Sequence, residues 1–116
     1  MFRPPGDRLN NGWTNYAKKK NYVVVMWSID PKDFLQPPAA AIARRVLSQA
    51  STGAIVLLHD GGPNRKHSVE ALSEIIPKLK QQGYRFVTVP QLLEMQAAQK
   101  QRITIANPNK QTSGPN

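Results

Sequence analysis

The chain has 116 residues, with 16 Lys or Arg against 7 Asp or Glu, so its formal net charge at pH 7 is +9. That length allows one domain with a modest core, and the absence of cysteine excludes disulfides, thiolate zinc sites and cysteine nucleophiles. No run of about 18 apolar residues occurs, which excludes a membrane-spanning helix, and no apolar stretch follows Met1 as a secretory signal would require.

The first part of the chain predicts a loop, a short helix and a buried strand. Residues 1–9 are rich in proline and are typical of a loop, and a helix is expected from residue 10 or 11 to residue 20. Residues 22–29 form a continuous apolar, β-branched run that ends at Asp30. This is the pattern of a strand covered on both faces, as in a parallel sheet.

The rest of the chain repeats this alternation. Helix, strand, helix, strand and helix are expected in turn at residues 39–50, 54–58, 68–82, 85–89 and 90–100. Ser68 is the expected N-cap of its helix, and Pro77 should kink that helix. The alternation predicts an α/β fold with a parallel sheet and crossover helices over residues 1–100, followed by a flexible tail at residues 101–116.

The positive charge is spread along the chain. Residues 1–20 carry +4, residues 21–60 carry 0, residues 61–100 carry +3 and the last sixteen carry +2, so Lys18–Lys20 is the one true cluster. A net charge of this size suggests a polyanionic partner, such as nucleic acid or an anionic cell-wall polymer. Its spread weakens that argument, and no RNA-binding signature or helix-turn-helix spacing supports nucleic acid.

Three polar residues are candidates for one site. In parallel α/β folds, ligands collect beyond the carboxyl ends of the strands, where Asp30 and His59 are expected, and Arg3 lies in the first loop. A carboxylate beside imidazole holds its tautomer and raises its basicity, so an Asp30–His59 pair is a candidate general acid. Taken singly, each of the three residues is more often a structural or surface group, as is His67.

Four segments taken together are more specific than any one residue. They are Phe2–Gly6, Trp27–Phe34, Ile55–Asp60 and Gly83–Val89, and in order and spacing they resemble the carboxyl-terminal half of the polysaccharide deacetylase (NodB-homology) family. The resemblance spans residues 2–95. It implies alternating β/α units of a partial, irregular (β/α) barrel. It also implies an enzyme that removes N- or O-acetyl groups from chitin, peptidoglycan or xylan with a divalent metal, commonly zinc.

The resemblance assigns catalytic roles to three residues. His59 would protonate the departing amine or alcohol, Asp30 would tune His59, and Arg3 would orient the catalytic Asp of the family's first motif. The first two motifs, which supply the base and the metal ligands, are absent from this chain. We therefore expect no metal bound by this chain and no activity of the chain alone, although the family itself needs a divalent metal.

The resemblance also assigns residues to the substrate side. Gly6 would offer an oxyanion-binding backbone N–H, Phe34 would form a groove wall where Trp is more common, and Leu57 would line the acetyl pocket. Asp7 stands where the family often has Gly, which puts the conformation of this loop in doubt.

The implied partner is an acetylated polysaccharide, with a parent enzyme at the cell envelope and self-association through an exposed sheet edge. One alternative is a non-catalytic module that binds carbohydrate or anionic wall polymer. Another, a nucleic-acid-binding protein, rests on charge alone.

Overall fold

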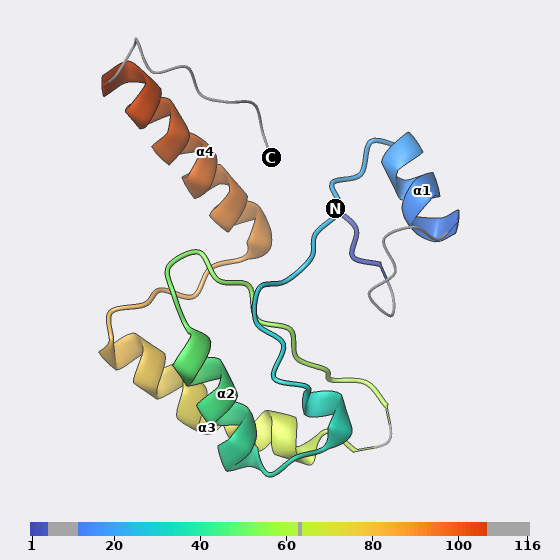
Figure 1. Ribbon diagram of the computed structural model, residues 1–116, viewed down its shortest axis with the longest axis vertical. Helices are drawn as coiled ribbons and strands as arrows, with labels where there is room; N and C mark the ends of the chain where they lie inside the picture. Colours follow the sequence, from blue (N-terminus) through green and yellow to red (C-terminus); the bar gives the residue numbers. More distant parts are fainter. Residues whose placement is uncertain (5–11, 63, 107–116) are drawn as a thin grey trace. The chain divides into compact units, whose positions relative to one another are not determined.

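The computed structural model describes residues 1–4, 12–62 and 64–106. The chain divides into two units, residues 1–84 and residues 85–116, and each is described by itself. Figure 1 shows the helices of the described residues, which are α1 (Gly12–Lys19), the 3-10 turn η2 (Asp33–Leu35), α2 (Ala39–Gln49), α3 (Lys66–Gln81) and α4 (Val89–Ala106). No helix among the described residues is long and apolar enough to cross a membrane.

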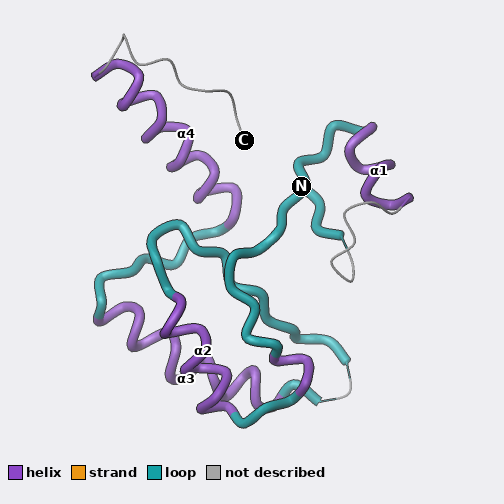
Figure 2. Tube along the Cα trace, in the orientation of Figure 1, coloured by secondary structure: helices purple, strands orange, loops and turns teal. Residues whose placement is uncertain are grey.

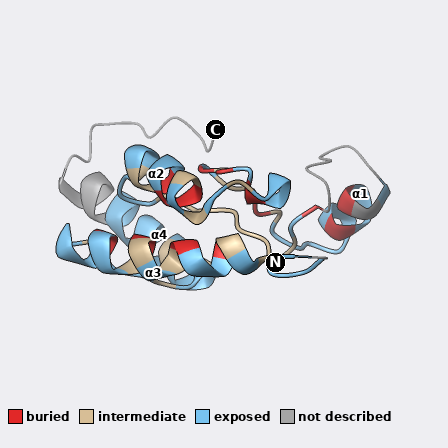
Figure 3. Cartoon of the chain, turned by 90° about the horizontal axis from the view of Figure 1, so that it is seen from below, coloured by how far each residue is buried: buried red, intermediate tan, exposed pale blue. Residues whose placement is uncertain are grey.

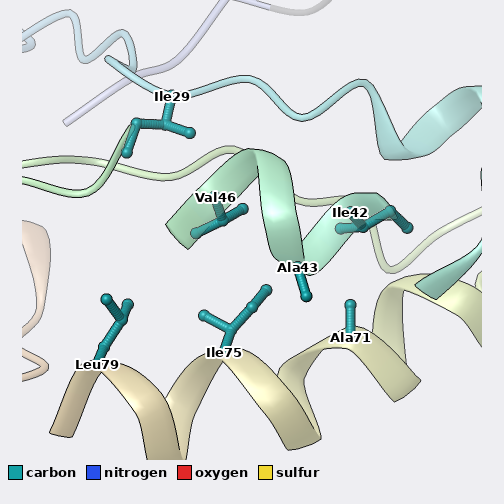
Figure 4. Close-up of a cluster of buried hydrophobic side chains, with 7 residues drawn as sticks. All are labelled: Ile29, Ile42, Ala43, Val46, Ala71, Ile75 and Leu79. Carbon is teal, nitrogen blue, oxygen red and sulfur yellow. The ribbon is translucent and has the colours of Figure 1, made fainter. Parts of the chain in front are cut away.

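The core of the first unit lies between α2 and α3. Each helix has small or branched apolar residues one turn apart, which form a stripe on one side. Figure 4 shows these stripes facing each other, with Ile29 beside them; the buried residues are Ile29, Ile42, Ala43, Val46, Ala71, Ile75 and Leu79. Figure 3 shows that the outer surfaces of both helices are largely exposed, so the periodicity in the sequence correctly identifies the buried side of each helix.

Two of the predicted strands are extended segments rather than strands. Figure 2 shows no strand in the described part of the chain. Isolated parallel bridges join Phe2 to Val24 and Ile29 to Val56. Around the second bridge, Ile29 N–H donates to Ile55 O at 3.1 Å and Leu57 N–H donates to Ile29 O at 2.9 Å. The parallel direction agrees with the expected topology, but the ladder stops after one bridge.

The start of the first extended segment is not covered on both faces. A parallel strand is normally covered by helices on both faces, yet Tyr22 and Val23 are 53% and 56% exposed. The expectation of a partial (β/α) barrel therefore needs correction for this chain: its described residues are mainly helical, and the sheet is reduced to two bridges.

Three boundaries also differ from expectation. Helix α3 begins at Lys66, so Ser68 lies inside it rather than capping it. The segment at residues 85–89 forms no strand, and α4 begins at Val89. Helix α4 continues to Ala106, six residues into the expected tail, and none of its described side chains is buried.

Candidate functional site

The site is built on the turn that follows the first extended segment. Asp30 Oδ1 accepts a hydrogen bond from the Lys32 backbone N–H at 2.9 Å, which closes a tight turn. Lys32 has φ 56°, residues 33–35 form the 3-10 turn η2, and Gln36 has φ 58°. Two residues in the left-handed conformation thus flank η2. The turn places Asp33 inside the protein and leaves Asp30 half-buried.

Asp33 is the most buried acidic side chain of the described residues and is 1% exposed. Its Oδ2 accepts hydrogen bonds from the His59 backbone N–H at 2.8 Å and from Ser68 Oγ at 2.7 Å. Its Oδ1 lies 2.7 Å from His59 Nδ1. Both oxygens are therefore engaged, and the plane of the carboxylate is fixed by groups from two other segments.

The environment of Asp33 favours its charged form. Burial acts to raise the pKa of Asp33, but the hydrogen bond from the His59 N–H, the one from Ser68 and the contact with the His59 ring together hold it below its ordinary value. A carboxylate that is ionised at neutral pH can only accept hydrogen bonds. His59 Nδ1 must therefore carry a proton and donate it to Asp33 Oδ1.

The imidazole of His59 is oriented with one edge toward solvent. Its side chain is 36% exposed, and its Nε2 makes no hydrogen bond within the described part of the chain. The Phe34 ring stands edge-on to it, with ring centroids 5.7 Å apart. His59 is thus held at Nδ1 and flanked by an aromatic ring, its side chain is partly exposed, and its Nε2 makes no hydrogen bond among the described residues. That is the arrangement of a group that exchanges a proton with a ligand.

Arg65 connects the two loops of the site. Its Nε donates to Gly61 O at 2.6 Å and its Nη1 donates to Phe34 O at 3.4 Å. Gly62 has φ +102°, and a Cβ there would lie 2.9 Å from Arg65 Nη2. The guanidinium therefore lies against a loop that requires glycine, and it ties the segment after His59 to the turn that carries Phe34.

Of the other predicted site residues, Arg3 makes its hydrogen bonds to the first extended segment. Arg3 donates to Val25 O at 3.3 Å and to Met26 O at 3.4 Å, and its guanidinium stands 5.9 Å from the Trp27 ring centroid. Leu57 is half-buried in the second extended segment. Gly6 lies outside the described residues.

The structure corrects the expected acid pair, because Asp33 and not Asp30 contacts His59. Sequence reasoning also missed Ser68 and Arg65. A signal for Asp33 is present, since it directly precedes the aromatic residue of the same motif. No comparable signal marks Ser68 or Arg65.

The described residues do not fit a catalytic metal site. A catalytic zinc needs three protein ligands, and no group of three His, Cys, Asp or Glu side chains is close enough to bind one within the described ranges. The chain has two histidines. His59 Nδ1 is bound to Asp33, and His67 Nδ1 lies 3.3 Å from Gln36 O.

Comparison with known proteins gives consistent results. No family model matches the chain. Over 95 residues it is 48% identical to a peptidoglycan-N-acetylglucosamine deacetylase of Bacillus cereus, which covers 80% of this chain and 45% of that protein. The chain thus spans less than half the length of this relative.

Solved structures show the same similarity. The peptidoglycan deacetylase PdaC of Bacillus subtilis matches with a TM-score of 0.71 and 36% identity, over 90% of this chain and 47% of that one. A CE4-family pseudoenzyme of Bacillus anthracis matches with a TM-score of 0.69 and 32% identity, over 79% of this chain and 31% of that one. Because a pseudoenzyme is among the neighbours, the shared fold does not by itself imply activity.

Proposed function

The chain belongs to the polysaccharide deacetylase (NodB-homology) family, and we propose that it supplies the acid side of a deacetylase site acting on a peptidoglycan-type polysaccharide. The contact of Asp33 with His59 at 2.7 Å carries this proposal. It is supported by the buried position of Asp33 and by the partial exposure of the His59 side chain. The names of the relatives suggest N-acetylglucosamine or N-acetylmuramic acid units as the acetylated sugar.

In this proposal His59 acts in its protonated form. Asp33 stabilises the imidazolium and keeps Nδ1–H directed toward Oδ1, so that the Nε2 proton is the one that is transferred. As the C–N bond of the amide breaks, its nitrogen accepts this proton and leaves as an amine. The acetyl carbon retains the oxygen of the attacking water and leaves as acetate. General acid catalysis of this kind contributes roughly 100- to 10,000-fold in rate.

The remaining predicted residues take substrate roles. The Phe34 ring, 43% exposed and beside His59, suits a wall against which a sugar ring packs. We assign Leu57 to the acetyl pocket, Gly6 to the oxyanion contact and Arg3 to orientation of the catalytic base. For Arg3, the contacts with Val25 O and Met26 O support a fixed position for the guanidinium.

The base and the metal are not assigned to residues of this chain. Its two histidines are committed elsewhere, one as the acid and one beside Gln36 O. The acid side therefore requires a complementary base side, and the 116-residue chain alone is expected to release no acetate from acetylated peptidoglycan.

A chimera tests the proposal. The 95 matching residues of the Bacillus cereus relative are replaced by the corresponding residues of this chain, and acetate release from peptidoglycan is measured. The chimera should be active, and His59→Ala should lower its kcat by about 100-fold or more. His67→Ala is the matched control and should retain activity. Full activity in a folded His59→Ala chimera would disprove the role of His59.

A non-catalytic wall-polymer-binding module is the second candidate, and the net charge of +9 favours it. It predicts that the 116-residue chain sediments with peptidoglycan sacculi carrying anionic polymer, and that added salt releases it. Failure to sediment at low ionic strength would eliminate this candidate.

A further inference from the structure

We propose that Ser68 is a positioning residue for His59, because its hydroxyl holds the Asp33 carboxylate in the orientation that the imidazole requires. The inference deepens the proposed function, since it rests on His59 being the acid. The hydroxyl of Ser68 donates to Asp33 and not to the His59 ring, so Ser68 acts on the ring through Asp33.

Within the described part of the chain, Ser68 gives the Asp33 carboxylate its one hydrogen bond that does not come from His59. Asp33 receives two hydrogen bonds from His59, one from its backbone N–H and one from its ring, so both move with the same residue. The bond from Ser68 Oγ at 2.7 Å comes from α3, 35 residues along the chain, and Ser68 is 5% exposed. Without it, the hydrogen bonds that restrain the terminal torsion of Asp33, which has a broad energy profile, would come from His59 only among the described residues.

The hydroxyl is not explained by the needs of the helix. A serine in the first turn of a helix often bonds to free backbone N–H groups. Here Oγ donates to a carboxylate on another segment, while the residue at the helix start, Arg65, makes no side-chain cap. A hydrogen bond to a charged acceptor is stronger than one to a neutral acceptor. The bond from Ser68 to Asp33 is therefore strongest when Asp33 is ionised.

The hydrogen bonds of Asp33 join three segments of the chain, and Ser68 supplies the bond to the third. The carboxylate is on η2, His59 follows the second extended segment, and Ser68 is in α3, whose opposite end packs against α2 through Leu79. The position of the imidazole is thus linked to the helical core through Ser68 as well as to its own loop.

Nuclear magnetic resonance of the isotope-labelled 116-residue chain tests the proposal without an activity assay. The Asp33 carboxyl carbon reports the pKa of that group, and the two ring nitrogens of His59 report its tautomer. In Ser68→Ala we expect the pKa of Asp33 to rise and the His59 tautomers to become mixed, because the carboxylate loses one donor. Ser68→Thr keeps the hydroxyl and should retain both wild-type values.

Ser73→Ala is the matched control, because Ser73 is an exposed serine in the same helix. If Ser68→Ala does not fold, Ser68→Val and Ser68→Thr provide the comparison, since they have similar volumes and differ in the hydroxyl. Unchanged Asp33 and His59 signals in Ser68→Ala, or identical signals in the Thr and Val variants, would overturn the proposal. An active His59→Ala chimera would instead refute the acid role and leave the Asp33 result standing.

Discussion

Asp33→Asn removes the charge at the centre of the site without changing its shape. Asp33 accepts three hydrogen bonds, at 2.8, 2.7 and 2.7 Å, and a bond to a charged group contributes roughly 1 kcal/mol more than a neutral one. The negative charge therefore strengthens the three bonds by about 3 kcal/mol in total. The cost of burying the charge offsets part of this gain. The lowered pKa of Asp33 indicates that the charged form gains on folding. We expect Asp33→Asn to lose about 1–2 kcal/mol of unfolding free energy at pH 7.

The loss should depend on pH in a defined direction. The pKa of an unfolded Asp is about 3.9, and the pKa of folded Asp33 is lower. The stabilisation is therefore complete above about pH 5 and is lost as the pH falls through the unfolded and then the folded pKa. Urea denaturation at pH 7 and about pH 3 should show a smaller difference between wild type and variant at the lower pH. Asp60→Asn, at an exposed position, is the control. An equal difference at both pH values would refute the reasoning.

Two further substitutions test the packing and the Arg65 contact. Ile42→Ala, at a fully buried position, should lower the free energy of unfolding by about 2–5 kcal/mol in urea denaturation. Val69→Ala, at a position 62% exposed, is the control and should change it by less than about 0.5 kcal/mol. Similar losses in the two variants would show that Ile42 is not in the core. Gly62→Ala should lower stability by about 1–2 kcal/mol in thermal denaturation, because φ is +102° there, and should displace Arg65, which NMR would detect. Gly61→Ala, with open space around it, is the control and should leave both the stability and Arg65 unchanged.

The helices of the core could be predicted because their signals are local. Ile42 and Val46 are one turn apart in α2, as are Ala71, Ile75 and Leu79 in α3, and burial of such a stripe follows from periodicity. The start of α3 could not be located in the same way. Ser68 has the residue type of an N-cap, but its hydroxyl is used by a carboxylate 35 residues away, which no local pattern encodes.

The strands were less predictable because strand formation depends on neighbours. The apolar run at residues 22–29 has the composition of a buried strand, and it does pair in parallel through Ile29. Composition cannot say whether the adjoining chain covers both faces, and Tyr22 and Val23 remain exposed. The direction of pairing was thus encoded in the order of the elements, whereas the extent of pairing was not.

The acid pair shows the same division between local and non-local information. Sequence places Asp30 and Asp33 after one segment and His59 after its neighbour, so a carboxylate–imidazole contact follows from topology. The choice between the two carboxylates depends on the turn. Lys32 and Gln36 adopt left-handed conformations without the Gly or Asn that usually marks them. The two carboxylates act in series: Asp30 closes the turn through the Lys32 N–H, and the turn places Asp33 against His59.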